Sequence, residues 1–98
     1  MRVMMKVRIP VEAGNAAVKS GLMRDGIREF AERAKPEAMF FTLDGGVRTM
    51  YAVLEMASSA DMPRLGEPLL MGLNAGIDIT PCMNVEELSE GLKAAHLA

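Results

Sequence analysis

Cysteine, histidine and aromatic residues are scarce in this sequence. It contains one cysteine, one histidine, one tyrosine, three phenylalanines and no tryptophan. The single Cys82 has no partner for an internal disulfide, a redox pair or a zinc cage, so we expect a reducing, cytoplasmic environment. His96 stands alone, and no metal-ligand spacing, serine elbow or phosphate-cradling motif occurs. The sequence therefore predicts neither a metal site nor a cofactor.

A charge surplus and a long apolar run are missing as well. Eleven Lys and Arg against thirteen Asp and Glu give a net charge of −2, which leaves no positive surplus to attract nucleic acid or an anionic membrane. No stretch approaches the ~18 consecutive apolar residues of a membrane span. Arg and Lys interrupt the first eight residues, unlike the apolar core of a signal peptide. We expect a soluble, unprocessed protein without nucleic-acid or membrane partners.

The composition that remains is that of a globular protein. Of the 98 residues, 50% are apolar and 24% charged, which argues against disorder. A chain of this length supports one hydrophobic core, so we predict a single domain over residues 1–98. The ten methionines are dispersed along the chain, which favours core filling over a soft-metal site.

Period-two and helical patterns predict the first half of the fold. Val3, Met5, Val7 and Ile9 alternate with more polar residues, which indicates a strand ended by Pro10. Helical spacing then runs from a candidate N-cap, Asn15, to Ala34; Gly21 and Gly26 weaken this helix enough for its first turns to separate. Strands at 38–43 and 47–56 flank Asp44-Gly45-Gly46, a hairpin signal. A two-residue loop pairs Phe40 with Tyr51, Phe41 with Met50 and Thr42 with Thr49, whereas a bulged three-residue loop breaks this parity.

The second half is predicted in the same way. Asp61 is placed to cap a helix, and Pro68 predicts a break or kink near residues 66–67. Residues 76–80 alternate as a fourth strand. Asn84 and Glu87 resemble a capping box that opens a last helix.

This order of elements resembles the ferredoxin-like βαββαβ fold with an extra C-terminal helix. The chain is also similar to the dimeric α+β barrel superfamily, and to a group of short uncharacterised bacterial proteins. The resemblance to that group rests on Gly14-Asn15-Ala16-Ala17, Lys35-Pro36-Glu37-Ala38, Phe41-Thr42, Glu67-Pro68-Leu69, Leu73-Asn74-Ala75 and Thr80-Pro81. It implies an α+β fold with a four-stranded antiparallel sheet and no catalytic residues to carry over.

One face of such a sheet is covered by helices, and the other faces water unless a partner packs there. Met4, Phe40, Tyr51 and Val53 fall on this open face. Leaving them wet forfeits several kcal/mol, comparable with the stability of the whole domain. We therefore expect a homodimer formed through the sheet face; the alternative is a monomer with a half-solvated sheet.

The open face also carries charged groups that are costly to bury unless they are paired. Aromatic walls with a few convergent polar groups are typical of small-molecule pockets. The candidate ligand-binding residues are Lys6, Arg8, Phe40, Thr49, Tyr51, Glu55 and Asp78. The alternative interpretation is that these charges neutralise one another across the sheet.

Three functions follow as hypotheses. The first is a homodimer that binds a small, partly apolar molecule on the open sheet face. The second is a cofactor-free enzyme, since the resemblance extends to muconolactone isomerase and small monooxygenases, with Lys6, Tyr51, Glu55 or Asp78 transferring protons. The third is a structural or regulatory dimerisation module with a dry interface.

Overall fold

A computed structural model describes residues 1–97 of the chain. The elements are β1 (Arg2–Ile9), α1 (Val11–Ser20), α2 (Leu22–Ala34), β2 (Ala38–Asp44), β3 (Val47–Glu55), α3 (Asp61–Leu73), β4 (Gly76–Pro81) and α4 (Val85–Ala94). The four strands form one antiparallel sheet in the order β2-β3-β1-β4. This confirms the α+β class, and the strand order is compatible with the ferredoxin-like arrangement.

The β2–β3 hairpin has the register that a two-residue loop predicts. Phe40 lies opposite Tyr51, Phe41 opposite Met50 and Thr42 opposite Thr49. Gly45 and Gly46 have φ angles of 62° and 83°, which a tight primed turn requires and which glycine adopts without strain. The alternation of both strands is thereby fixed, and with it the face that each side chain occupies.

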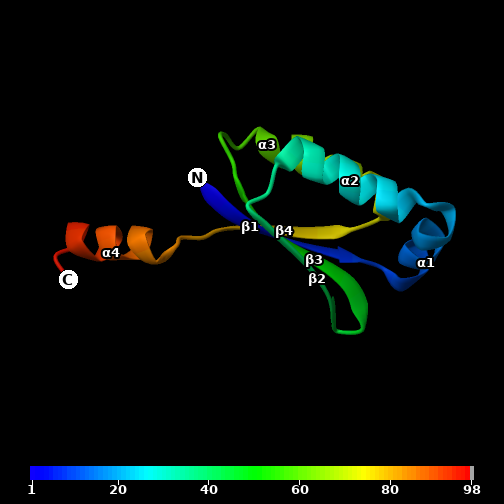
Figure 1. The fold of residues 1–98 in the computed structure, drawn as a ribbon, viewed down its shortest axis with the longest axis horizontal. Coiled ribbons are helices and arrows are strands. Elements are labelled where there is room, and N and C mark those ends of the chain that lie inside the picture. Colours follow the sequence, from blue (N-terminus) through cyan, green and yellow to red (C-terminus); the bar gives the residue numbers. More distant parts are fainter. Residues whose placement is uncertain (98) are drawn as a thin grey trace.

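Helices α1, α2 and α3 lie on one side of the sheet (Figure 1). The strand residues that alternate toward them are buried, as Val3, Met5 and Val7 are, each with no more than 1% of its surface exposed. Phe30 of α2 and Leu65 of α3 are fully buried against them. The core therefore lies between this helical layer and one face of the sheet, and the second face is left without a covering layer.

The start of the first helix differs from the prediction at Asn15. Helix α1 begins at Val11, directly after Pro10, and the Gly14 N–H donates to the Pro10 carbonyl at 2.8 Å. The separation predicted at Gly21 is observed, because this residue adopts φ 86° between α1 and α2. Asn15 is thus free to use its side chain elsewhere.

Of the break or kink predicted near Pro68, the break is absent, because α3 runs without interruption from Asp61 to Leu73. Leu65, Leu69 and Leu73 form one buried stripe along this helix. Pro68 lies on the exposed side, where water can reach the carbonyl that lacks a donor. Packing of the leucines outweighs the cost of about 3 kcal/mol for an interior proline.

Helix α4 is separated from the body of the molecule (Figure 1). The predicted capping box is present: the Asn84 side chain accepts from the Glu87 N–H at 2.8 Å, and the Glu87 carboxylate accepts from the Asn84 N–H at 3.1 Å. The radius of gyration is 15.5 Å, compared with about 13 Å for a compact domain of this length. Among the helices of residues 1–97, none is long and apolar enough to cross a membrane.

Candidate functional site

The open face of the sheet brings most of the candidate ligand-binding residues into one region. In the register, Lys6 lies between Tyr51 on β3 and Asp78 on β4. Arg8 lies opposite Thr49, and Phe40 lies opposite Tyr51. Phe40 is 70% exposed. This face therefore carries an exposed aromatic ring on β2 and two cationic side chains on β1, with Tyr51 of β3 between Phe40 and Lys6.

Asp44, at the end of β2, joins three of these residues. Its carboxylate accepts from the Lys6 ammonium at 2.9 Å and from the Tyr51 hydroxyl at 3.1 Å. Arg8 approaches the second carboxylate oxygen at 3.9 Å and donates to the Asp44 carbonyl at 3.3 Å. The Lys6 ammonium also lies 5.8 Å from the centre of the Tyr51 ring, within range of a cation–π contact. These four residues, which we call the Asp44 cluster, join two cationic side chains to one carboxylate and carry a net charge of +1.

The pKa values in the Asp44 cluster move apart. The pKa of Asp44 is lowered mainly by the hydrogen bond from Lys6, and further by the hydrogen bond from Tyr51 and by the positive charge of Lys6. The hydrogen bond to Asp44 raises the pKa of Lys6. Both groups consequently stay ionised around neutral pH. This favours an ion pair over the proton-transfer role that the enzyme hypothesis gives to Lys6.

Replacing Asp44 by Asn will remove a contribution to stability that depends on pH. A carboxylate whose pKa is lowered by folding stabilises the native state above its ordinary pKa, and this contribution is lost as pH falls through the lowered value. The melting temperature of the variant will therefore be lower than that of the parent protein at pH 7, and the difference between the two will shrink below about pH 4. The exposed Asp78→Asn serves as the control. A difference that persists unchanged at pH 2 contradicts the pairing.

Besides Phe40, three other candidate residues lie outside the Asp44 cluster. Glu55 pairs with the N-terminal amine of Met1 and lies opposite Arg2, at the far end of β1. Asp78 is exposed beside Lys6, although the Lys6 ammonium bonds to Asp44. Thr49 is 2% exposed and its hydroxyl donates to the Val47 carbonyl at 3.1 Å. The seven residues thus share a face without converging on one point.

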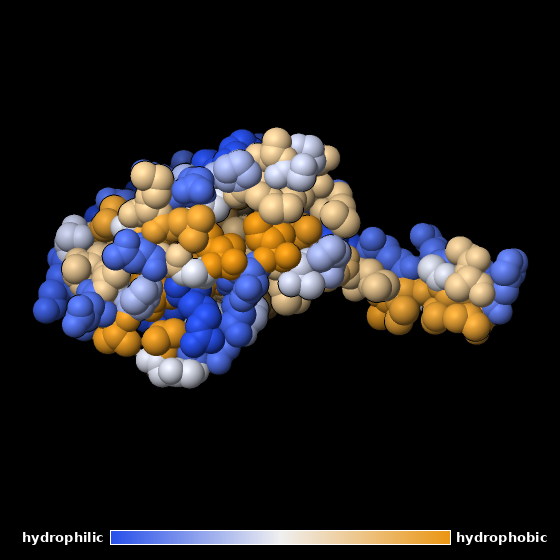
Figure 2. Space-filling model, turned by 180° about the vertical axis from the view of Figure 1, so that it is seen from behind, coloured by the Kyte–Doolittle hydropathy of each residue, from blue (hydrophilic) through white to orange (hydrophobic). Residues whose placement is uncertain are grey.

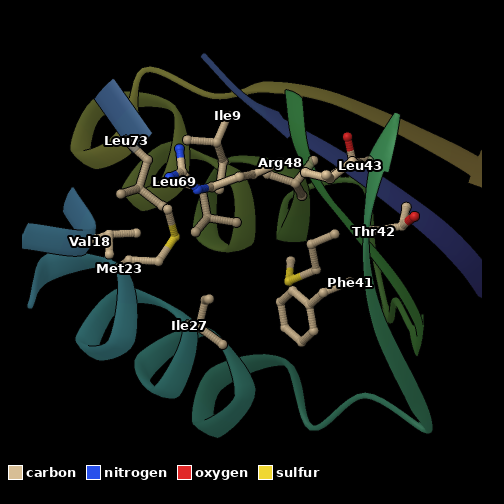
Figure 3. Close-up of a pocket in the computed structure, with 13 residues that line it drawn as sticks. Ile9, Val18, Met23, Ile27, Phe41, Thr42, Leu43, Arg48, Leu69 and Leu73 are labelled. Atoms are coloured by element: carbon tan, nitrogen blue, oxygen red, sulfur yellow. The ribbon is translucent and has the colours of Figure 1, made fainter. Parts of the chain in front are cut away.

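A cavity of about 410 Å³ lies between the helices and the hairpin end of the sheet. Its apolar walls come from all three packed helices and from β2, through Val18, Met23, Ile27, Phe41, Leu69 and Leu73. Figure 3 shows Met23, Ile27 and Phe41 around this space. Phe41 is 55% exposed although it faces the helical side, because the helices do not cover this end of β2. The volume falls in the range of small-molecule sites.

Arg48 provides a charged group at this cavity. Its guanidinium lies across one side of the pocket (Figure 3) and donates from Nη2 to the Asn15 side-chain oxygen at 3.1 Å. The guanidinium passes over Gly14, where a Cβ atom would meet Arg48 Nη1 at 2.5 Å. The glycine on α1 therefore makes room for Arg48, and Asn15 fixes its orientation. The result is an apolar cavity with one cationic hydrogen-bond donor.

Asp44 and all pocket residues except Thr49 are absent from the site predicted from the sequence. The period-two pattern places Asp44 on the same face as Phe40 and Thr42. This alternation was a signal for the cluster. It was overlooked because Asp44 was interpreted as a turn residue. The pocket had no comparable signal, because its existence depends on how far α2 extends over β2. Of the seven candidate residues, Thr49 also lines the cavity.

The structure therefore defines an α+β protein with two distinct surfaces, a charged open sheet face and an apolar cavity under the helices. Comparisons of the chain with protein-family models, curated proteins and solved structures found no match. Function is consequently inferred from the geometry of these two surfaces.

Proposed function

We propose that this protein binds a small, largely apolar molecule that carries one anionic or hydrogen-bond-accepting group. The observation that carries the proposal is the cavity of about 410 Å³, whose walls are apolar and whose rim holds Arg48. The apolar part of the ligand displaces water from Met23, Ile27 and Phe41, and this supplies most of the affinity. The Arg48 guanidinium orients the polar end. This site lies on the opposite side of the sheet from the face that the sequence predicts.

The proposed assembly is a homodimer in which two open sheet faces pack together, as in a dimeric α+β barrel. Met4 and Phe40 are 40% and 70% exposed on this face, and a two-fold axis uses the same patch twice. Within one chain, Asp44 already pairs with Lys6 and lies 3.9 Å from Arg8, which leaves one positive charge on the cluster. Covering these charges then costs less than covering unpaired ones. The cavity opens on the other side and stays accessible in such a dimer.

Two fluorescent probes of the same shape test the ligand site: anilinonaphthalene sulfonate and its neutral parent, N-phenylnaphthylamine. Filling the cavity by Ile27→Trp will weaken both probes by about tenfold or more, because the apolar volume is removed. Arg48→Leu will weaken the sulfonate by about tenfold, since a hydrogen bond to a charged group is worth roughly 1.5 kcal/mol or more. The neutral probe will change by no more than about twofold in Arg48→Leu, because it lacks the anionic group. Fluorescence titration of the parent protein and of both variants with each probe measures the six dissociation constants.

Met71→Trp is the matched control, because Met71 is 79% exposed on α3 and is not among the residues lining the cavity. It will leave both probe affinities unchanged. Thermal unfolding of each variant establishes that the fold is retained, since a loosened core also binds such probes. If Ile27→Trp binds each probe as tightly as the parent protein does, the cavity is ruled out as the binding site.

A further inference from the structure

Helix α4 carries a narrow apolar stripe that contacts no core. Val85, Leu88 and Leu92 of the helix and Ala95 at its C-cap are spaced by three and four residues, which is the a/d pattern of a coiled-coil seam. No residue of the helix is buried, and Val85 and Leu88 remain 73% and 46% exposed. Figure 2 shows hydrophobic residues gathered along one side of this helix, away from the body of the molecule. The stripe is therefore an unpartnered surface.

A helix of this kind depends on a partner for its stability. It has ten residues, and isolated helices shorter than about 12–15 residues are marginal in water. Its N-terminus is fixed to the body by the Arg2–Glu87 ion pair, and the capping box between Asn84 and Glu87 closes its first turn. These contacts set where the helix begins, but they bury none of the stripe. A second apolar surface is needed to shield it.

The stripe has the features of one that packs against another copy of itself in the antiparallel sense. With a two-fold axis near residue 90, Leu88 faces Leu92 of the partner, and Val85 faces the smaller Ala95. Ser89 and Gly91 flank the stripe on its two sides, so two helices can approach closely. A helix that packs against a broad globular surface has a wider apolar face, whereas a stripe as narrow as that of α4 suits packing against a single helix.

The charges on α4 select the antiparallel orientation. The first half of the helix is acidic, with Glu86, Glu87 and Glu90, and the last turn carries Lys93. Parallel pairing places the acidic half of one helix at the level of the acidic half of the other, which is unfavourable although Glu90 itself lies on the side away from the seam. Antiparallel pairing places the acidic half beside the basic end of the partner helix, and it also opposes the two helix dipoles.

We propose that α4 is an interaction surface that pairs antiparallel with α4 of a second copy of this chain. A pair of such ten-residue stripes buries less than the ~1,200 Å² of a standard stable interface. The pairing is therefore weak and concentration-dependent, and it links chains in addition to any contact between sheet faces. It uses neither the cavity nor the open sheet face.

Disulfide trapping tests the pairing and its direction. The background is Phe40→Lys with Cys82→Ser, which places a charge on the open sheet face and removes the native thiol. Antiparallel packing predicts that Leu88→Cys and Leu92→Cys each give little crosslinked dimer alone under mild oxidation. An equal mixture of the two gives a crosslinked heterodimer, at least tenfold above either variant by itself. Glu90→Cys, on the opposite side of the helix, is the control and gives no increase when mixed with Leu88→Cys.

Sedimentation supplies the second readout. The average molecular mass of the Phe40→Lys protein will rise with concentration. When Leu88→Asp is added to the same background, the average mass will stay equal to the mass of one chain. Crosslinking of Leu88→Cys alone shows parallel pairing and overturns the proposal. No crosslink in the mixture of Leu88→Cys and Leu92→Cys also overturns the proposal. If, in addition, Leu88→Asp lowers the thermal stability, α4 packs against its own chain, and this outcome overturns the proposal as well. None of these outcomes depends on probe binding in the cavity, so the two proposals fail independently.

Discussion

Phe30→Ala will lower the free energy of unfolding by about 3–5 kcal/mol, the usual cost of truncating a buried aromatic side chain. Phe30 is fully buried on α2 within the core that includes Met5, Leu54 and Leu65. The variant loses the transfer free energy of the ring and leaves a cavity that the sheet and helices cannot fully close. Urea denaturation measures the effect as a lower midpoint with an unchanged slope.

Phe41→Ala is the matched control for this measurement, since it removes the same ring from a position that is 55% exposed. We expect it to cost no more than about 1 kcal/mol. If the two variants destabilise the protein equally, the core does not lie between α2 and the sheet as described. A fall in the slope for Phe30→Ala would instead indicate a change in the denatured ensemble.

Local patterns predicted the elements whose residues determine their own structure. The hairpin register followed from alternation and from two glycines that adopt positive φ. The capping box at Asn84 and Glu87 followed from a spacing of three. In these cases the contacts that fix the structure lie within a few residues of one another, so the sequence contains the whole cause.

The errors arose where distant contacts decide. Pro68 has a local cost, but the buried stripe of Leu65, Leu69 and Leu73 on the other side of α3 keeps the helix continuous. Asn15 has the side chain of an N-cap, yet it bonds to Arg48 on β3 across the sheet-to-helix contact. Residue type alone cannot show which of two available partners a polar side chain takes.

The candidate site was predictable to a similar extent. Placing Lys6, Tyr51 and Asp78 on one face of the sheet needed only the period-two alternation, and this placement is correct. That Lys6 bonds to Asp44 depended on side-chain reach along the sheet, which periodicity does not contain. The cavity depended on the uncovered end of β2, a property of how the layers overlap.

Phe40→Lys will weaken dimer formation through the open sheet face by roughly a thousandfold. Burying a phenylalanine side chain is worth about 2 kcal/mol, and a two-fold interface loses it at two symmetric positions, which corresponds to about three powers of ten in the dissociation constant. The substitution also brings two additional positive charges toward the Lys6 and Arg8 side chains of the same face, which opposes their desolvation. Because Phe40 is already 70% exposed in the single chain, the stability of the fold itself will change little.

Analytical ultracentrifugation across a wide concentration range measures the effect, and Met71→Lys is the control. Met71 is 79% exposed on α3, so the same change of an apolar side chain to lysine is made on the helical side of the molecule. We expect Met71→Lys to dimerise as the parent protein does. A Phe40→Lys protein that dimerises as strongly as the parent would exclude the open sheet face as the interface, while leaving the cavity and its proposed ligand untouched, because the two lie on opposite sides of the sheet.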